Sequence, residues 1–112
     1  MAIYPAPRWL QFYRYVGPAE AYAVETSRIV ATFSPTARTW YTPDRYATRV
    51  DAQVFLAMPG VPSHRVGPYP EDELPHWTVP LRRVAPSFGQ PGGGWEAATD
   101  DSAFVFGILP LA

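Results

Sequence analysis

Residues 83–97 of the chain read Arg83-Val84-Ala85-Pro86-Ser87-Phe88-Gly89-Gln90-Pro91-Gly92-Gly93-Gly94-Trp95-Glu96-Ala97. Three consecutive glycines lose more backbone entropy on folding than any other triplet. A folded domain therefore keeps them where the backbone passes close to another group or adopts a positive φ. Glu96 follows at the point where an apolar strand begins. The stretch predicts either the wall of a ligand site, with Glu96 at the mouth of the loop, or a plain glycine-rich hairpin with an exposed acid.

The composition is that of a small globular domain. With 112 residues, the chain predicts a single domain, residues 1–112, with one modest core. The 14 prolines predict short elements and many turns. A net charge of −1 gives no basic field of the kind that binds nucleic acid. All 9 basic residues are arginine, so any bound anion would be held by guanidinium groups.

Several classes of site and location are disfavoured by what the sequence lacks. It contains no cysteine, which excludes disulfides, zinc–thiolate centres and thiol nucleophiles. His64 and His76 lack the spacing of metal ligands, so we expect no metal. No signal peptide and no stretch of membrane-spanning length is visible, so we expect no membrane association and export only by another carrier.

The first predicted strand carries an arginine in an unusual position. Residues 8–16 are rich in aromatic and β-branched side chains, and with a period of two Arg14 shares a face with Phe12 and Val16. A charged group among apolar neighbours is costly unless it meets an anion or a carboxylate. Arg14 therefore either meets such a group or belongs to an edge strand and points to water.

Proline and glycine divide the rest of the chain into short elements. Pro18 stands at the first position of one helix, and Thr48 with Asp51 starts another in the manner of a capping box. We expect Val54, Phe55 and Met58 to face the core. The expected helices cover 18–25 and 48–58, and the expected strands cover 8–16, 29–33, 38–43, 64–66, 76–85, 95–99 and 103–109.

Three details complete the predicted architecture. Pro80 places the 76–85 strand at a sheet edge, and residues 100–102 join the last two strands as a hairpin. The acids of residues 71–73 form a solvated surface loop. Together the elements predict an α+β domain, mostly antiparallel sheet with two short helices.

The order of these features resembles the ADP-ribosyltransferase superfamily: an aromatic strand with an arginine, a strand ending in an aromatic–hydroxyl pair, and a late glycine-rich loop that delivers an acid. Residues 85–94 look like the closing motif of the tuberculosis necrotizing toxin family of NAD glycohydrolases. Residues 12–16 followed by 17–20 are similar to small NAD-using domains at the carboxyl ends of bacterial polymorphic toxins. The resemblance implies a split, mostly antiparallel sheet of the ADP-ribosyltransferase type.

The resemblance also implies roles for individual residues. Arg14 matches the first-strand arginine that holds the phosphate or ribose of NAD, which would be the substrate. Thr42, with Tyr41 beside it, matches the position whose hydroxyl braces the site, although many transferases have Ser-Thr-Ser where this chain has Trp-Tyr-Thr. Glu96 matches the acid of the Arg–Ser–Glu triad.

Two departures bear on what accepts the ADP-ribose. The toxin glycohydrolases carry glutamine at or near the position of Glu96, so this glutamate favours a transferase-type site. Gly94 stands where arginine-specific transferases have Glu, which speaks against arginine as acceptor and leaves another macromolecular acceptor or water.

The implied chemistry is cleavage of the nicotinamide–ribose bond through an oxocarbenium-like state, which the Glu96 carboxylate would stabilise. Arg14 would neutralise the pyrophosphate, and the loop glycines would let backbone amides approach the ligand.

Each further contact has a structural alternative. Tyr41 either stacks on nicotinamide or, like Trp40, belongs to the core. Arg65 is either a second phosphate contact or a surface residue. Gln90 either contacts the ligand or serves the turn. Phe88 and Trp95 are further stacking candidates.

The sequence leaves three candidate functions for the domain. The first is a secreted or delivered bacterial toxin domain, an effector that transfers ADP-ribose from NAD to a protein or nucleic-acid target in the target-cell cytoplasm. The second is an NAD glycohydrolase that depletes NAD. Either would imply a cognate immunity protein. The third is a non-catalytic protein-interaction module, which the aromatic and proline content and the acidic loop suit.

Overall fold

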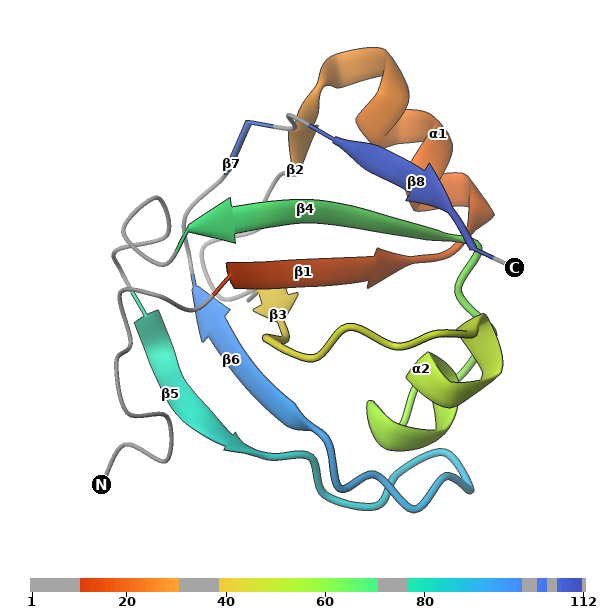
Figure 1. The fold of residues 1–112 in the computed structure, drawn as a ribbon, viewed down its shortest axis with the longest axis vertical. Coiled ribbons are helices and arrows are strands. Elements are labelled where there is room, and N and C mark those ends of the chain that lie inside the picture. Colours follow the sequence, from red (N-terminus) through yellow and green to blue (C-terminus); the bar gives the residue numbers. More distant parts are fainter. Residues whose placement is uncertain (1–10, 31–38, 71–76, 100–102, 105–106, 112) are drawn as a thin grey trace.

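Two three-stranded antiparallel sheets form the framework of the molecule (Figure 1). The computed structural model describes residues 11–30, 39–70, 77–99, 103–104 and 107–111. Along the chain the elements are β1 (Gln11–Val16), α1 (Pro18–Ser27), β2 (Ile29–Val30), β3 (Thr39–Tyr41), α2 (Arg49–Phe55), β4 (His64–Pro70), β5 (Trp77–Arg83), β6 (Trp95–Thr99), β7 (Ala103–Phe104) and β8 (Ile108–Pro110). One sheet has the order β1-β4-β8, the other β3-β6-β5, and β2 pairs with β7. The expected α+β class is confirmed.

Among the residues that the structure describes, the two sheets are joined at a single backbone pair. Tyr13 N–H donates to the Thr42 carbonyl at 2.7 Å, and Thr42 N–H donates to the Tyr13 carbonyl at 2.8 Å. Beyond this pair β1 continues with β4, and β3 continues with β6, so the sheets diverge. The Trp40 carbonyl takes a hydrogen bond from Arg14 Nη1 at 3.1 Å instead. Arg14 therefore occupies the point at which the sheets part.

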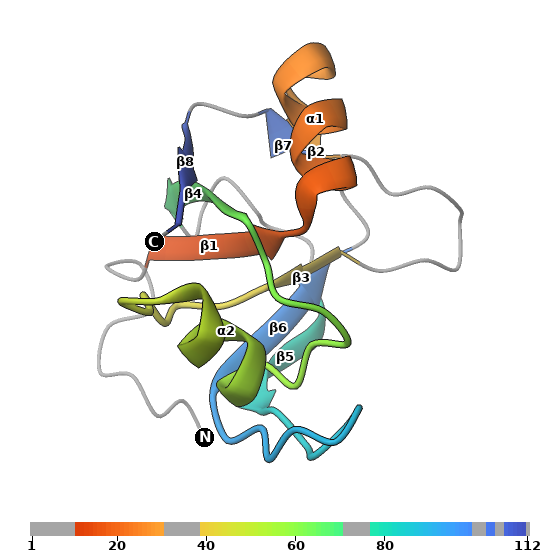
Figure 2. The ribbon, with the colours of Figure 1, turned by 90° about the vertical axis from the view of Figure 1, so that its right-hand side faces the viewer.

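The two faces of β1 belong to two different cores, as the alternation of its sequence predicts. Phe12 and Val16 pack with α1, β3, β4 and β6. The tyrosines at 13 and 15 pack on the opposite face, where Ala52 of α2 is fully buried. The two helices lie on opposite sides of β1 in both views (Figure 1 and Figure 2).

The first helix and the edge strand follow the sequence-based expectation. Pro18 stands at the first position of α1 after the extended Gly17, and the helix runs two residues beyond the predicted end, to Ser27. β5, which contains Pro80, lies at the edge of its sheet as expected. A proline is tolerated there because one side of an edge strand makes no ladder hydrogen bonds. β6 has the predicted bounds.

The second helix is shorter than predicted. Thr48 caps it, accepting from Asp51 N–H, but the helix ends at Phe55 instead of Met58. The reason is that the carbonyls of Val54 and Phe55 accept from the amides of Gly92 and Gly94, both at 3.0 Å. Phe55 is also 42% exposed, so its assignment to the core was wrong. Its ring stacks on Tyr46, with centroids 5.6 Å apart.

Two strand predictions were also wrong. β4 continues through Gly67-Pro68 to Pro70, because a register shift opposite Phe12 and Arg14 accommodates the irregular backbone. The strand predicted over 103–109 is two strands with different partners, β7 against β2 and β8 against β4. Hence β6 and β7 do not form the predicted hairpin; β6 pairs with β3 and β5.

Some predictions fall outside the described residues, namely the acidic residues 71–73, the turn at 100–102, residues 8–10 of the first strand and residues 31–33 of the second. Within the described part of the chain, no helix combines the length and the apolar character needed to cross a bilayer.

A glycine series tests the contact between the loop and its surroundings. Gly92 has φ +70°, and a Cβ there would lie 2.5 Å from the Val84 carbonyl oxygen. Gly92→Ala should therefore lower the free energy of unfolding by about 2–4 kcal/mol, combining left-handed strain with overpacking. Gly89→Ala isolates the strain, because its φ is +76° but its surroundings are open, and should cost about 1 kcal/mol.

Gly60→Ala is the control, since nothing lies near its Cβ position. Urea unfolding of the three variants measures the difference. Equal stability of Gly92→Ala and Gly60→Ala would contradict the packing of this loop.

Candidate functional site

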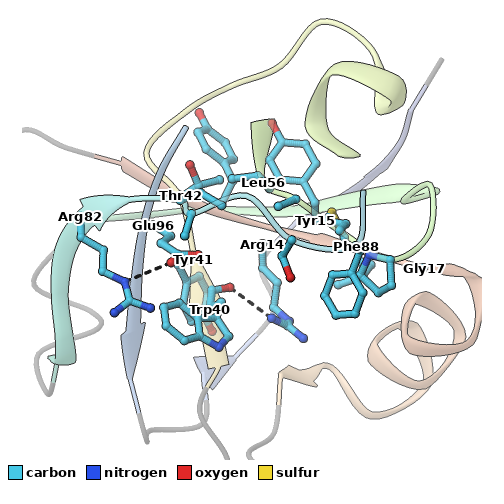
Figure 3. Close-up of a pocket in the computed structure, with 18 of the residues that line it drawn as sticks. Arg14, Tyr15, Gly17, Trp40, Tyr41, Thr42, Leu56, Arg82, Phe88 and Glu96 are labelled. Carbon is cyan, nitrogen blue, oxygen red and sulfur yellow. Dashed lines mark hydrogen bonds and ion pairs between the residues drawn. The ribbon is translucent and has the colours of Figure 1, made fainter. Parts of the chain in front are cut away.

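A cavity of about 510 Å³ opens where the two sheets diverge, a size within the range of small-molecule sites (Figure 3). Its walls come from the end of β1 and the start of α1, from β3, from the chain after α2, and from β5, the following loop and β6. Segments far apart in the sequence therefore supply one site.

Most of the residues singled out from the sequence line the cavity, namely Arg14, Trp40, Tyr41, Thr42, Phe88 and Glu96. Gln90 is not among the lining residues. Its backbone pairs with that of Ser87 in both directions, at 2.8 and 3.1 Å, so Gln90 closes a tight turn. The first half of the loop, from Val84 to Phe88, forms one wall of this cavity.

Arg14 meets a carboxylate, as one of its two alternatives required. Its Nε and Nη2 bind the two oxygens of Glu20 at 2.6 and 2.8 Å. Glu20 lies in the first turn of α1, where a carboxylate is favoured by the helix dipole. With Nη1 on the Trp40 carbonyl, every nitrogen group of the guanidinium has an acceptor. The pair fixes α1 to the divergence of the sheets.

Glu96 is held by a second arginine. Arg82 and Glu96 are directly opposite one another in the β5–β6 ladder, and Arg82 Nε donates to Glu96 Oε2 at 3.1 Å. The guanidinium carbon of Arg82 also lies 5.1 Å from the centre of the Trp40 ring. In Figure 3 Arg82 and Arg14 lie on either side of Trp40. The cavity thus contains two arginine–glutamate pairs, Arg14 with Glu20 and Arg82 with Glu96.

Asp44 connects the residues that position Glu96. The Thr42 hydroxyl oxygen accepts a hydrogen bond from Asp44 N–H at 3.0 Å. Asp44 Oδ2 accepts from Tyr46 Oη at 3.0 Å and from Trp95 N–H at 2.9 Å. The chain after β3 is thereby bonded to the residue preceding Glu96, which fixes the start of β6.

Tyr41 and Phe88 contribute to the site in opposite ways. Tyr41 is 2% exposed, and its ring meets those of Tyr69 and Trp77 edge-on, so it is a core residue that forms the floor of the cavity. Phe88 is 66% exposed at the rim, with φ +52°. Phe88 thus has a free ring face for stacking, whereas Tyr41 has almost none.

The remaining expectations concern residues outside the cavity lining. Trp95 carries the Arg83 guanidinium 4.0 Å from its ring centre. Arg65 is only 9% exposed and lies 4.9 Å from the centre of the Tyr13 ring, so its interpretation as a surface arginine was wrong. Neither residue lines the cavity. The loop amides of Gly92 and Gly94 bind α2 carbonyls, which corrects the expectation that they face a ligand.

Sequence reasoning missed Glu20, Arg82 and Asp44. An acid at the start of a helix just after an arginine-bearing strand is a usable signal for Glu20. Arg82 required the β5–β6 register, which the bulges in β5 conceal. Asp44 follows a Thr-Pro pair, a position typical of a side chain that bonds local backbone.

Among the residues that the structure describes, no three histidine, aspartate or glutamate side chains gather as metal ligands would. No protein family model matches the chain, and comparison with curated proteins and with solved structures finds no match.

The Tyr41 hydroxyl offers a test of the cavity floor. It is buried and makes no hydrogen bond to a described residue. Burial raises the pKa of this phenol above its ordinary value, and the neighbouring Tyr69 raises it further. Tyr41→Phe should therefore leave the free energy of unfolding unchanged or raise it by up to about 1 kcal/mol.

The same substitution has a pH signature. Because the folded pKa is the higher one, the unfolded chain releases this proton first, and wild-type stability falls as pH rises above about 10. Tyr41→Phe should lose less stability there. Urea unfolding between pH 8 and 11 checks this, with the exposed Tyr22→Phe as control. A loss above about 1 kcal/mol at neutral pH would reveal a partner for the hydroxyl.

Proposed function

We propose that this domain binds NAD in the cavity and cleaves the bond between nicotinamide and ribose, transferring ADP-ribose to a macromolecular target. The observation that supports this best is the meeting of Arg14, Thr42 and Glu96 at one cavity. They come from β1, from the residue after β3 and from β6. These are the positions that the resemblance to ADP-ribosyltransferases marks. A divergence between two antiparallel sheets also suits a site of this kind, because it leaves space that no ladder fills.

In the proposed reaction, the bond from ribose C1′ to the nicotinamide nitrogen breaks, and nicotinamide leaves with the bonding electrons. A nucleophilic atom of the acceptor forms the new bond to C1′ and loses its proton. Positive charge develops on the ribose as the first bond lengthens. The Glu96 carboxylate stabilises this charge and accepts a hydrogen bond from a ribose hydroxyl.

The environment of Glu96 supports this role. Its side chain is 18% exposed, so it reaches the cavity while solvent access is restricted. The Asp44 contact to Trp95 N–H fixes the adjacent backbone, and a fixed carboxylate needs little reorganisation in the transition state. Phe88 at the rim supplies an exposed ring on which nicotinamide or adenine can stack.

Transfer and hydrolysis differ in the molecule that accepts the ADP-ribose. Gly94 is buried, and a Cβ there would lie 3.0 Å from the Phe55 carbonyl oxygen and would also meet Tyr46 Oη. No side chain can project from this position to recognise an arginine acceptor. This favours either another acceptor on a protein or nucleic acid, or water, in which case the domain is an NAD glycohydrolase.

The biological setting is proposed from the resemblance alone. A domain of this kind would be a toxin delivered into a target cell and acting in its cytoplasm, and its producer would hold a cognate immunity protein. The alternative of a non-catalytic interaction module is the outcome if calorimetry detects no NAD binding by the purified domain.

Glu96→Gln tests the proposed catalytic role. The substitution should reduce NAD cleavage by about 10²–10³-fold, because the transition-state charge loses its carboxylate. Since the partner Arg82 is 55% exposed, stability should change by less than about 1 kcal/mol. Nicotinamide release and thermal unfolding measure the two effects.

Glu25→Gln makes the same charge change on α1, away from the cavity lining, and should retain full turnover. Full activity of Glu96→Gln would exclude the assigned role of this carboxylate.

A labelling experiment separates the acceptors. NAD labelled in the adenosine moiety is incubated with the domain and cell lysate. Transfer places the label on protein or nucleic acid, whereas hydrolysis yields free ADP-ribose alone. We expect label on macromolecules in the wild type and its loss in Glu96→Gln. Label that is confined to free ADP-ribose would assign the domain as a glycohydrolase.

A further inference from the structure

The two arginines of the cavity differ in how many of their nitrogens are already used. Arg14 donates from Nε and Nη2 to Glu20 and from Nη1 to the Trp40 carbonyl. Its side chain is 21% exposed. A ligand anion could bind Arg14 only by displacing a bidentate carboxylate and by leaving a backbone carbonyl without its donor.

Arg82 is engaged much less. It donates a single hydrogen bond, from Nε to Glu96 Oε2 at 3.1 Å. Its Nη nitrogens donate to no residue that the structure describes. Its side chain is 55% exposed, and its guanidinium lies 5.1 Å from the centre of the Trp40 ring within the cavity wall. Two nitrogens therefore remain available to bind an anion bidentately.

The strengths of the two pairs decide which one a ligand opens. Exposed, singly bonded ion pairs contribute little to stability, whereas bidentate arginine–carboxylate pairs are among the stronger polar contacts. The Arg82–Glu96 pair is the weaker one on both counts. Opening it also frees the carboxylate that the proposed reaction needs, because Glu96 Oε2 is otherwise bonded to Arg82 (Figure 3).

We propose that Arg82, and not Arg14, is the residue that binds a phosphate group of the ligand, and that this phosphate draws Arg82 away from Glu96 and so exposes the carboxylate. The inference rests on the proposed function and refines its substrate class. A substrate that carries a diphosphate is required for efficient cleavage, and a riboside with the same scissile bond leaves Glu96 paired. Arg14 acts as a positioning residue that holds α1 and the divergence of the sheets.

The experiment compares Arg82→Gln with Arg83→Gln. Arg83 is the adjacent arginine on β5, has the same charge, and binds the Gly93 carbonyl and the Trp95 ring outside the cavity lining. Binding of ADP-ribose and of inorganic pyrophosphate is measured by calorimetry. Turnover of NAD is compared with turnover of nicotinamide riboside, which has the same scissile bond and no phosphate.

We expect Arg82→Gln to bind ADP-ribose about 10- to 100-fold more weakly than wild type, as for the loss of one charged contact. The preference of kcat/KM for NAD over nicotinamide riboside should fall by a similar factor, while Arg83→Gln keeps both. If Arg82→Gln behaves like Arg83→Gln in an enzyme that cleaves NAD, the inference is overturned and the proposed function stands.

The other outcomes are equally decisive. Wild-type protein that binds ADP-ribose through Arg82 but cleaves no NAD, with or without lysate, would support the phosphate site and refute the enzymatic function. Wild-type protein that binds neither ADP-ribose nor pyrophosphate would overturn both.

Discussion

The backbone pair between Tyr13 and Thr42 is the constraint on which the rest of the structure depends. It joins β1 to β3 at one point, and the strands then follow different partners. Such a divergence leaves backbone groups that a continuing ladder would satisfy, and buried groups of this kind must find other partners. Arg14 supplies one by donating to the Trp40 carbonyl, and Glu20 neutralises the charge that this brings inside. The cavity is therefore a direct consequence of how the sheets are joined.

The glycine-rich loop and α2 depend on each other in a similar way. The last carbonyls of α2 accept from Gly92 and Gly94, so the helix ends where the loop arrives. Only glycine allows this approach, because a Cβ at either position would meet backbone oxygen. The amides of the loop thus stabilise the scaffold, and its first half supplies the cavity wall. Asp44 completes the connection by binding Trp95 N–H, next to Glu96.

Local signals predicted much of this fold, and long-range pairing explains what they missed. Pro18 and Thr48 marked both helix starts, and the alternation along β1 separated the two cores. Local sequence could not predict where α2 ends or that residues 103–109 form two strands, because each is decided by a partner distant in the sequence. The same holds for the site. The loop stretch and the first strand identified Glu96 and Arg14, but their partners required the register of β5 and the placement of α1.

The pairing of charges explains why residue types alone do not define the chemistry of this cavity. Two arginines and two glutamates line it, so its formal charge is balanced without a ligand. An anion entering it gains only where a guanidinium can exchange partners at low cost, and this depends on how many hydrogen bonds each cation already makes. The bidentate Arg14–Glu20 pair resists exchange and has a structural role, whereas the exposed, singly bonded Arg82–Glu96 pair is the one that an anion can open at low cost. Within one cavity, the same two residue types therefore serve different purposes, and the distinction is set by geometry.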